Sequence, residues 1–240
     1  MARYAGEVSS FPSATPTAPE SGPGLFVTFE GGDGSGKSTQ AARLTTALVS
    51  SGERVVRTRE PGGTPLAETL RSLVLEHGHG PIDARTEALL YATARASHVD
   101  QVIRPALRRG DVVVCDRFVD SSLAYQGFGR ELGLEEVAEL NRFATGGLSP
   151  DLTFLLDISP EDGRARRTAG RRDEDRLESE PDAWHASIRE AFLQLAAAAP
   201  ERFVVIDATL SQDEITVRIT DAVTALRRTR AEAAAAGGQR

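Results

Sequence analysis

The chain is poor in the residues that form cross-links and metal clusters. Its 240 residues include a single cysteine, Cys115, and four scattered histidines. One cysteine excludes a disulfide framework within the chain and fits a reducing compartment, so we expect a cytoplasmic protein. The histidines show no metal-ligand spacing, which argues against a structural zinc site. No apolar run approaches the ~18 residues of a transmembrane helix, so we expect no membrane association.

Positive charge is also scarce. The chain has 28 Lys and Arg residues against 35 Asp and Glu, a net charge of −7. This balance offers no basic surface for duplex nucleic acid, and we expect no nucleic-acid partner. Local arginines must then hold any anionic substrate. Lys37 is the only lysine in the chain. Arginine is too long and too planar to replace an ammonium group packed against phosphate oxygens, so the position of this lysine is informative.

The two ends of the chain differ in composition from its middle. Residues Met1 to Gly24 are rich in Ser, Pro, Ala and Gly and lack the apolar core of a signal peptide, and Ala231 to Arg240 are rich in Ala and Gly. We therefore expect a disordered extension over residues 1–23, one folded domain over 24–230 and a disordered tail over 231–240.

Five short apolar, β-branched runs alternate with segments of helical period. The runs are near-continuously apolar, which is typical of strands covered on both faces. The predicted strands are Leu25–Glu30, Arg54–Arg59, Val112–Asp116, Leu152–Ile158 and Phe203–Asp207. The predicted helices are Ser38–Ser51, Pro65–Glu76, Thr86–Arg109, Leu134–Thr145, Asp182–Ala198 and Gln212–Arg230. This alternation predicts an α/β fold with a doubly wound, five-stranded parallel sheet, in which ligands bind beyond the carboxyl ends of the strands.

A phosphate-binding motif directly follows the first predicted strand. From Gly31 to Ser38 the chain reads Gly-Gly-Asp-Gly-Ser-Gly-Lys-Ser, which matches the P-loop pattern G-x-x-x-x-G-K-[ST] and opens a predicted helix. Glycines let backbone N–H groups converge on phosphate oxygens, and the helix N-terminus adds positive potential. Lys37 would reach the β- and γ-phosphates of ATP, and the Ser38 hydroxyl would bind Mg²⁺. A functionless glycine-rich turn is the weaker alternative. The predicted ATP-binding residues are Gly31, Gly32, Asp33, Gly34, Ser35, Gly36, Lys37, Ser38 and Thr39.

P-loop proteins include switches and motors as well as kinases. A GTP-dependent switch would read guanine through an Asn-Lys-x-Asp segment. The only asparagine here is Asn141, and it is followed by Arg142. A GTP switch is therefore disfavoured.

A carboxylate and an arginine end the third predicted strand. Asp116 could hold Mg²⁺ through water, and Arg117 beside it could grip an acceptor phosphate with two hydrogen bonds. An ordinary ion pair at a strand end is the alternative, and the P-loop favours the functional interpretation. Glu60 follows the second strand in Arg-Glu-Pro-Gly-Gly-Thr, whose sharp turn would place it near the same edge of the sheet, although it could simply belong to the turn.

Tyr91 and Arg95 lie four residues apart on a predicted helix and therefore share a face. An aromatic ring and a guanidinium group could there stack on a base and hydrogen-bond its edge. Routine packing on a helix surface is the better interpretation unless other motifs support a nucleotide site.

Four segments of the chain resemble bacterial thymidylate kinase. They are Phe29–Thr39, Thr58–Thr64, Asp116–Gly127 and the arginine-rich stretch near Asp173. The string Arg-Glu-Pro-Gly-Gly-Thr and the string Asp-Arg-Phe…Ser-Ser-Leu-Ala-Tyr-Gln-Gly are specific to that family, whereas the P-loop alone is not. The similarity runs from about Leu25 to the last predicted helix. It implies a P-loop fold of the nucleoside monophosphate kinase type with a lid over about residues 164–180, a homodimer formed through the long helices, and ATP-dependent phosphorylation of dTMP to dTDP for dTTP biosynthesis.

The resemblance also implies which residues bind dTMP. Asp33 would bond the 3′-hydroxyl, and Arg71 and Arg117 would bind the phosphate. Tyr91 would stack on thymine, and Arg95 and Gln126 would hydrogen-bond its edge, with Ser122 nearby. Tyr125 would crowd the 2′ position and so favour deoxyribose.

Six arginines lie between Arg164 and Arg176. Members of the family carry a catalytic arginine either in the P-loop or in the lid, and the P-loop of this chain has none. The resemblance therefore places that arginine in the lid, with Arg172 as first choice ahead of Arg167, Arg171 and Arg176. With Lys37, Asp116 and Glu60 it completes the predicted catalytic set. A solvated charged helix is the alternative, and nucleic-acid binding is disfavoured because three acidic residues interrupt the run and no aromatic residues do.

Two rival functions remain open. A kinase for another nucleotide or nucleoside would share this fold, and a panel of acceptors would distinguish it. A regulatory ATP-binding protein would bind ATP tightly without turnover on any monophosphate.

Overall fold

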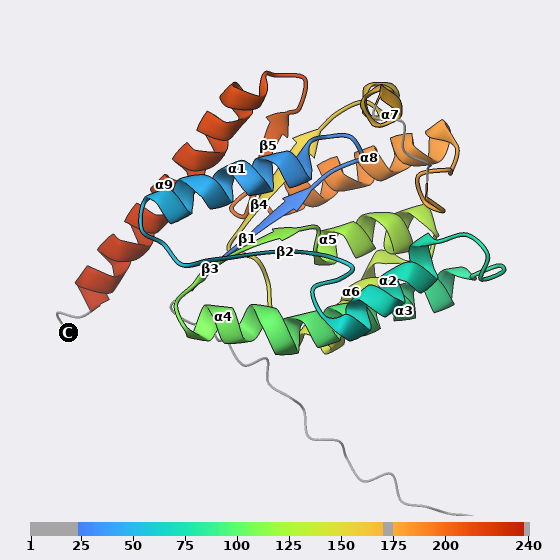
Figure 1. Ribbon diagram of the computed structural model, residues 1–240, viewed down its shortest axis with the longest axis horizontal. Coiled ribbons are helices and arrows are strands. Elements are labelled where there is room, and N and C mark those ends of the chain that lie inside the picture. The colour runs from blue at the N-terminus through green and yellow to red at the C-terminus, as the bar shows by residue number, and fades with distance from the viewer. Residues whose placement is uncertain (1–23, 170–174, 238–240) are drawn as a thin grey trace, which may run out of the picture.

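A computed structural model describes residues 24–169 and 175–237, with side chains described as far as residue 233. The described residues form a five-stranded sheet in the order β2-β3-β1-β4-β5, in which every pair is parallel (Figure 1). The predicted α/β class and parallel sheet are confirmed. The strands are β1 (Leu25–Glu30), β2 (Val55–Arg59), β3 (Val112–Asp116), β4 (Leu152–Asp157) and β5 (Phe203–Asp207).

The helices include segments that the sequence pattern did not predict, namely α7 and the stretch formed by α5 and η2. Both are short or strongly charged, so their apolar period is weak. The helical segments are α1 (Lys37–Ser50), α2 (Pro65–Leu75), α3 (Ala84–His98), η1 (Val99–Ile103), α4 (Arg104–Arg108), α5 (Val119–Ser122), η2 (Leu123–Gly129), α6 (Leu134–Thr145), α7 (Pro160–Ala169), α8 (Asp182–Ala198) and α9 (Gln212–Gly237).

The single helix predicted over Thr86–Arg109 is instead three consecutive segments, α3, η1 and α4. Its start is capped by Asp83, whose carboxylate accepts hydrogen bonds from the backbone N–H groups of Arg85 and Thr86. The π-helical turn η1 ends just before Pro105. Proline has no N–H to donate and its ring crowds the carbonyl four residues earlier, so widening the preceding turn lets the chain continue.

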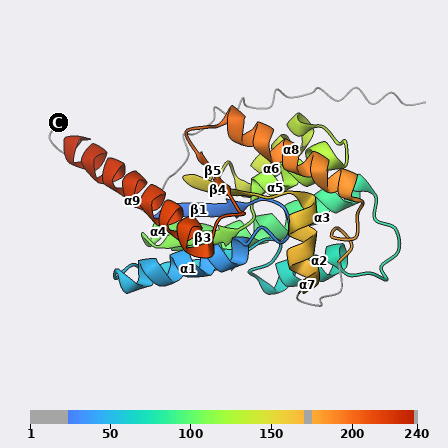
Figure 2. The same cartoon turned by 90° about the horizontal axis from the view of Figure 1, so that it is seen from above.

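The last helix also differs from its prediction, because α9 continues past Arg230 to Gly237. Residues 233–236 are four consecutive alanines, and alanine has the highest helix propensity. The end of α9 projects away from the sheet (Figures 1 and 2). Among the described helices, none combines the length and the hydropathy needed to cross a membrane.

The core lies on both faces of the sheet. On one face, Val27 and Phe29 of β1 pack with residues of α1 and α9, including Leu44 and Ile219. On the other, Phe26 packs with residues of η1, α4 and the segment after β3. Full burial of one such side chain contributes roughly 1.5–3 kcal/mol. The edge strands β2 and β5 are only partly buried, so the prediction that all five strands are covered on both faces is wrong for these two.

The strand register brings three predicted motifs together. Asp116 at the end of β3 pairs with Phe29 of β1 on one side and with Arg59 of β2 on the other. The backbone continues this alignment past the strands, where Glu60 N–H donates to the Asp116 carbonyl (2.9 Å) and Arg117 N–H donates to the Phe29 carbonyl (2.9 Å). The P-loop, the turn after β2 and the segment after β3 therefore meet at the carboxyl edge of the sheet.

Candidate active site

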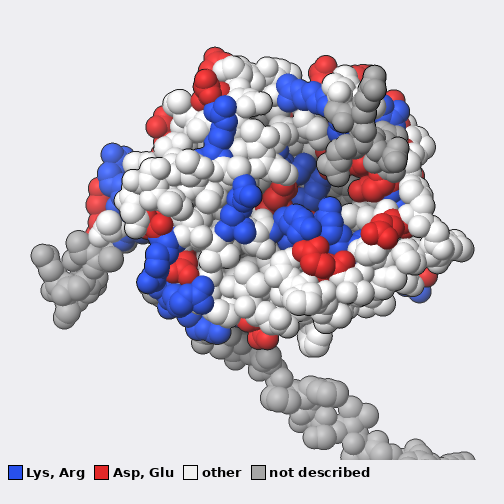
Figure 3. Space-filling model, in the orientation of Figure 1, with Lys and Arg blue, Asp and Glu red and all other residues white. Residues whose placement is uncertain are grey.

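A cavity of about 410 Å³ lies at this edge. Its walls come from the P-loop, the turn after β2, helices α2 and α3, the segment after β3, helix α7 and residues 175–178. The space-filling view shows a hollow here in which basic and acidic side chains lie together (Figure 3). A polar, mixed-charge cavity at the carboxyl ends of parallel strands is the usual place for a ligand in this architecture.

Lys37 lies at the donor end of the cavity, at the start of α1. Its ammonium group donates to the carbonyls of Gly31 (3.0 Å) and Gly32 (2.7 Å), so it is folded back over the loop. Burial, followed by the charge of Arg117, lowers the pKa of Lys37 to about 8. Gly36, just before the helix, has a φ of 95° and open space around its Cα. A phosphate here would meet backbone N–H groups, a helix N-terminus and a cation that lacks a full counter-charge.

Ser38 and Asp116 form the candidate metal position. The Ser38 hydroxyl donates a hydrogen bond to the Asp116 carboxylate, so a serine from α1 and a carboxylate from β3 point at the same place. Mg²⁺ prefers oxygen ligands and usually keeps several waters, with one or two protein groups and the substrate phosphates completing its shell. This pair of oxygen donors fits that chemistry.

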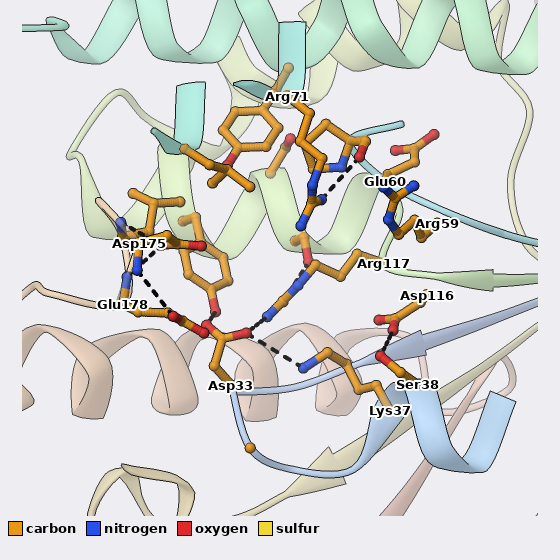
Figure 4. Close-up of a pocket in the computed structure, with 18 of the residues that line it drawn as sticks. Asp33, Lys37, Ser38, Arg59, Glu60, Arg71, Asp116, Arg117, Asp175 and Glu178 are labelled. Atoms are coloured by element: carbon orange, nitrogen blue, oxygen red, sulfur yellow. Dashed lines mark hydrogen bonds and ion pairs between the residues drawn. The ribbon is translucent and has the colours of Figure 1, made fainter. Parts of the chain in front are cut away.

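Asp33 and Arg117 form an ion pair across the middle of the cavity (Figure 4). Lys37 lies 3.9 Å from the same Asp33 oxygen, and the Tyr125 hydroxyl lies 3.5 Å from the other. Burial opposes ionisation of Asp33, but the charges of Arg117 and Lys37 outweigh it and hold its pKa well below the usual range. Two cations thus share one carboxylate, which leaves the centre of the cavity attractive to an additional anion.

The backbone of Arg117 is strained. Its φ is 70°, in the left-handed region, which costs a non-glycine residue roughly 1–3 kcal/mol. The side chain is tied down by donating to the Gly31 carbonyl and the Ser121 hydroxyl, both at 3.1 Å. Behind it, the buried carboxylate of Glu30 accepts from the Ser121 hydroxyl (2.6 Å) and from Phe118 N–H (2.7 Å). The structure maintains this conformation against its strain, as is common at functional sites.

Glu60 lies in a buried ionic network. Its two oxygens accept from Arg95 Nε (2.6 Å) and contact His98 Nδ1 (2.9 Å). Arg95 also donates to the Ser122 hydroxyl (2.9 Å), the Phe118 carbonyl (3.0 Å) and the Asn141 side chain. Four of its five N–H donors are thereby used within the protein. Arg95 therefore lines the cavity mainly as part of its wall, and its fifth donor, which bonds none of the described residues, is left for a ligand.

Arg71 and Tyr91 line the acceptor side. Arg71 donates to the Pro61 carbonyl (3.0 Å), and burial, with the nearby charge of Arg59, lowers its pKa. Arg59 itself is held by Glu68 in a two-point ion pair at 2.7 and 2.9 Å. Arg71 has no carboxylate partner of this kind among the described residues, which leaves its charge directed at the cavity (Figure 4).

Helix α7, which overlaps the start of the predicted lid, packs directly on the P-loop. A Cβ at Gly34 would lie 2.2 Å from the Gly163 carbonyl, and a Cβ at Gly163 would lie 2.6 Å from the Asp33 carbonyl. Only glycine permits such an approach. Arg167, one helical turn further along α7, donates to the Asp33 carbonyl (3.1 Å) and lines the cavity with Arg166.

The structure brings most of the predicted site residues into one cavity. Gly31, Gly32 and Ser35 belong to the same loop but do not line the cavity, and Gly31 and Ser35 are buried. Arg172, the first choice for the catalytic arginine, lies outside the described residues, as does Arg171. The predicted residues that line the cavity are Asp33, Gly34, Gly36, Lys37, Ser38, Thr39, Glu60, Arg71, Tyr91, Arg95, Asp116, Arg117, Ser122, Tyr125 and Gln126.

Some residues of the site were not predicted. Asp175 and Glu178, which lie within the predicted lid, line the cavity, and the Glu178 side chain lies near Asp33 of the P-loop (Figure 4). The buried carboxylates of Glu30 and Glu87 contact site residues from behind. The signal for Glu30 was a charged residue closing an otherwise apolar strand. Asp175 and Glu178 lie in an irregular segment where the sequence has no period to follow.

Comparisons with known proteins agree with this geometry. The family model described as thymidylate kinase matches residues 29–219. The thymidylate kinase of Leifsonia xyli subsp. xyli is 54% identical over 85% of this chain and 96% of its own length. That of Cutibacterium acnes is 51% identical over 85% of this chain and 98% of its own, and that of a Synechococcus strain is 52% identical over 83% and 95%. The chain that carries this P-loop, the strained arginine after β3 and the glycine-packed helix α7 therefore belongs to the thymidylate kinase family.

Proposed function

We propose that this protein transfers the γ-phosphoryl group of ATP to dTMP and so forms dTDP for dTTP synthesis. The observation that carries the proposal is the order in which the functional side chains are arranged along the cavity described above. Its P-loop end offers Lys37 and the Ser38–Asp116 pair, its centre offers Arg117, and its far wall offers Tyr91 and Gln126. These are the groups needed for a triphosphate, a second phosphate and a base, in that order.

At the donor end, Lys37 would leave the carbonyls of Gly31 and Gly32 and bond the β- and γ-phosphates of ATP. Ser38 directly and Asp116 through water would hold Mg²⁺, which neutralises charge on the phosphates when bound. The side chains and the loop N–H groups would keep the transferring phosphorus in line with the acceptor oxygen.

At the acceptor end, Arg117 and Arg71 would hold the phosphate of dTMP, and Asp33 would accept a hydrogen bond from the 3′-hydroxyl. An oxygen of the dTMP phosphate forms the new bond to the γ-phosphorus while the bond to the leaving ADP oxygen breaks. This oxygen is already anionic, so no strong general base is required. Catalysis then consists of positioning and charge neutralisation. Glu60 would contribute by holding Arg95 in place in the cavity wall.

The lid would complete the cationic surround of the transferring group. We propose Arg172 for this role, with Arg167 as the alternative from α7, which already reaches the P-loop. Lid closure would also exclude water, which otherwise competes as an acceptor.

The experiment that tests the function is an ADP-release assay with MgATP and a panel of acceptors. The panel contains dTMP, dUMP, UMP, CMP, AMP, GMP and thymidine. We expect strong preference for dTMP. Turnover only on another acceptor would reject the assigned substrate, and ATP binding without turnover on any acceptor would reject phosphoryl transfer.

Tyr125 provides a test of sugar selection. Its ring is buried against Trp184 and Phe192, with its hydroxyl toward Asp33. We expect Tyr125→Leu to raise the kcat/KM of UMP relative to dUMP by about tenfold, because a smaller side chain makes room for the 2′-hydroxyl. The two acceptors differ only at that position, so the ratio isolates the sugar. Tyr125→Phe, which keeps the ring, is the control for the hydroxyl. An unchanged ratio in Tyr125→Leu would refute the steric role.

We also propose that the protein is a cytoplasmic homodimer. Large apolar side chains are exposed on helices α3 and α6, including Leu89 at 55% and Phe143 at 89%. Covering them by a second copy would bury apolar surface that water otherwise contacts. Light scattering coupled to size-exclusion chromatography should give twice the monomer mass; a monomer at micromolar concentration would contradict the proposal.

A further inference from the structure

Glu87 is a buried carboxylate that the proposed reaction does not use. It lies in the first turn of α3 with no measurable exposure. Gln126 Nε2 donates to its Oε1 (2.9 Å), Arg176 donates to its Oε2, and Arg130 donates to both oxygens, each at 3.4 Å. A buried carboxylate is expensive unless its oxygens are paired, and here each oxygen has a donor.

These contacts determine which way the Gln126 amide faces. An amide has one donor end and one acceptor end, and a carboxylate between two guanidinium groups only accepts. Nε2 must therefore be the atom that faces Glu87. Gln126 Oε1 accepts no hydrogen bond from the described residues. It is also not fully buried, because a fully buried oxygen without a partner does not occur at Gln126. Because Gln126 lines the cavity, its free oxygen is the end that the cavity can reach.

We propose that Glu87 is a specificity-determining residue, which locks the Gln126 amide so that its carbonyl oxygen faces the acceptor base and selects bases with an N–H on that edge. The inference rests on the proposed function, because it concerns the base of the monophosphate acceptor.

The chemistry of the pyrimidines shows what this selection does. Thymine and uracil carry a hydrogen on N3 and can donate to a carbonyl oxygen. Cytosine presents a lone pair at N3, so the same oxygen would repel it and remain without a partner. A site built to bond one polar group rejects an analogue that lacks it far more strongly than an apolar pocket rejects a methyl difference. Glu87 would thus exclude cytosine without touching the nucleotide.

The variant that tests this is Glu87→Gln. A glutamine at this position can keep its oxygen toward Arg176 and Arg130 Nη2 and turn its amide nitrogen toward Gln126, at the loss of the 3.4 Å bond from Arg130 Nε. Gln126 can then reverse, so that Nε2 faces the cavity. We expect the ratio of kcat/KM for dTMP to kcat/KM for dCMP to fall at least about tenfold, because one hydrogen bond to the edge of the base is reversed. The loss for dTMP should appear mainly in KM, since the acceptor phosphate and Lys37 are untouched.

The matched control is Arg130→Gln, which removes another partner of Glu87 and leaves the contact with Gln126 intact. It should keep the wild-type ratio of dTMP to dCMP. An unchanged ratio in Glu87→Gln, or an equal fall in the control, would overturn the inference and assign Glu87 a purely structural role.

A ligand-side measurement keeps the inference testable if Glu87→Gln does not fold. Calorimetry on the wild-type protein should show dTMP binding at least about tenfold more tightly than its 3-methyl analogue, which lacks the N3 hydrogen. Equal affinities would refute a contact at N3. The two proposals fail in different ways. If the wild-type protein is inactive on dTMP, the proposed function is refuted. If the wild-type protein is active and Glu87→Gln keeps its ratio of dTMP to dCMP, only the role of Glu87 is refuted.

Discussion

Replacing Lys37 with alanine should lower phosphoryl transfer by on the order of 10³-fold or more while leaving the protein folded. An arginine that contacts the transferring phosphate contributes a factor of about 10³–10⁵ in GTPases, and we expect Lys37, a cation at the same group, to contribute at least the lower value. Here no other lysine can substitute, because Lys37 is the only one in the chain. Its ammonium is buried and its pKa is lowered to about 8, by burial first and then by Arg117. Folding therefore disfavours the charged form of the Lys37 side chain, so replacing Lys37 with alanine should not unfold the domain.

The measurement is steady-state ADP release with MgATP and dTMP, together with the midpoint of thermal unfolding. Thr46→Ala is a suitable control, since Thr46 is an exposed residue of the same helix. Turnover within tenfold of wild type in Lys37→Ala would contradict the P-loop assignment. Loss of turnover accompanied by unfolding would contradict the claim that Lys37 serves catalysis and not stability.

Replacing Glu60 with alanine should destabilise the protein by about 3–5 kcal/mol, the usual loss when one partner of a buried ion pair is removed. The side chains of Glu60 and Arg95 are each only 2% exposed, and that of His98 is fully buried. Alanine would leave the Arg95 guanidinium, which is almost fully buried, without its carboxylate partner. Because Arg95 also holds Ser122 and the Phe118 carbonyl, the wall of the base pocket should loosen as well.

Urea unfolding of wild type and Glu60→Ala would give the change in free energy of unfolding. Asp213→Ala provides the contrast, because Asp213 pairs with Arg43 at the surface and is 87% exposed. Exposed pairs contribute about 0–1 kcal/mol, so this control should change little. A loss below about 1 kcal/mol in Glu60→Ala would show that the buried network does not stabilise the fold.

Several elements could be predicted from the sequence because their signals are local. The five strands are short, apolar and β-branched, and three of them have the predicted bounds. The P-loop is a contiguous string whose glycines, lysine and serine each have a mechanical reason. Predictions were wrong where neighbours decide the outcome. Pro105 divides a periodic segment into α3, η1 and α4, and the edge strands lose the cover that their apolar sequence suggests.

By itself the sequence determined the parallel α/β class, the phosphate-binding loop and the family. Each of these depends on residues that are close together along the chain, or on contiguous motifs that are specific to one family. Only the tertiary structure decided how the site residues are held. Arg95 bonds Glu60 from 35 positions away, Gln126 bonds Glu87 from 39, and Arg117 bonds Asp33 from 84. No local pattern encodes such pairs, because they form only when parallel strands place their carboxyl ends side by side and the helices close over them.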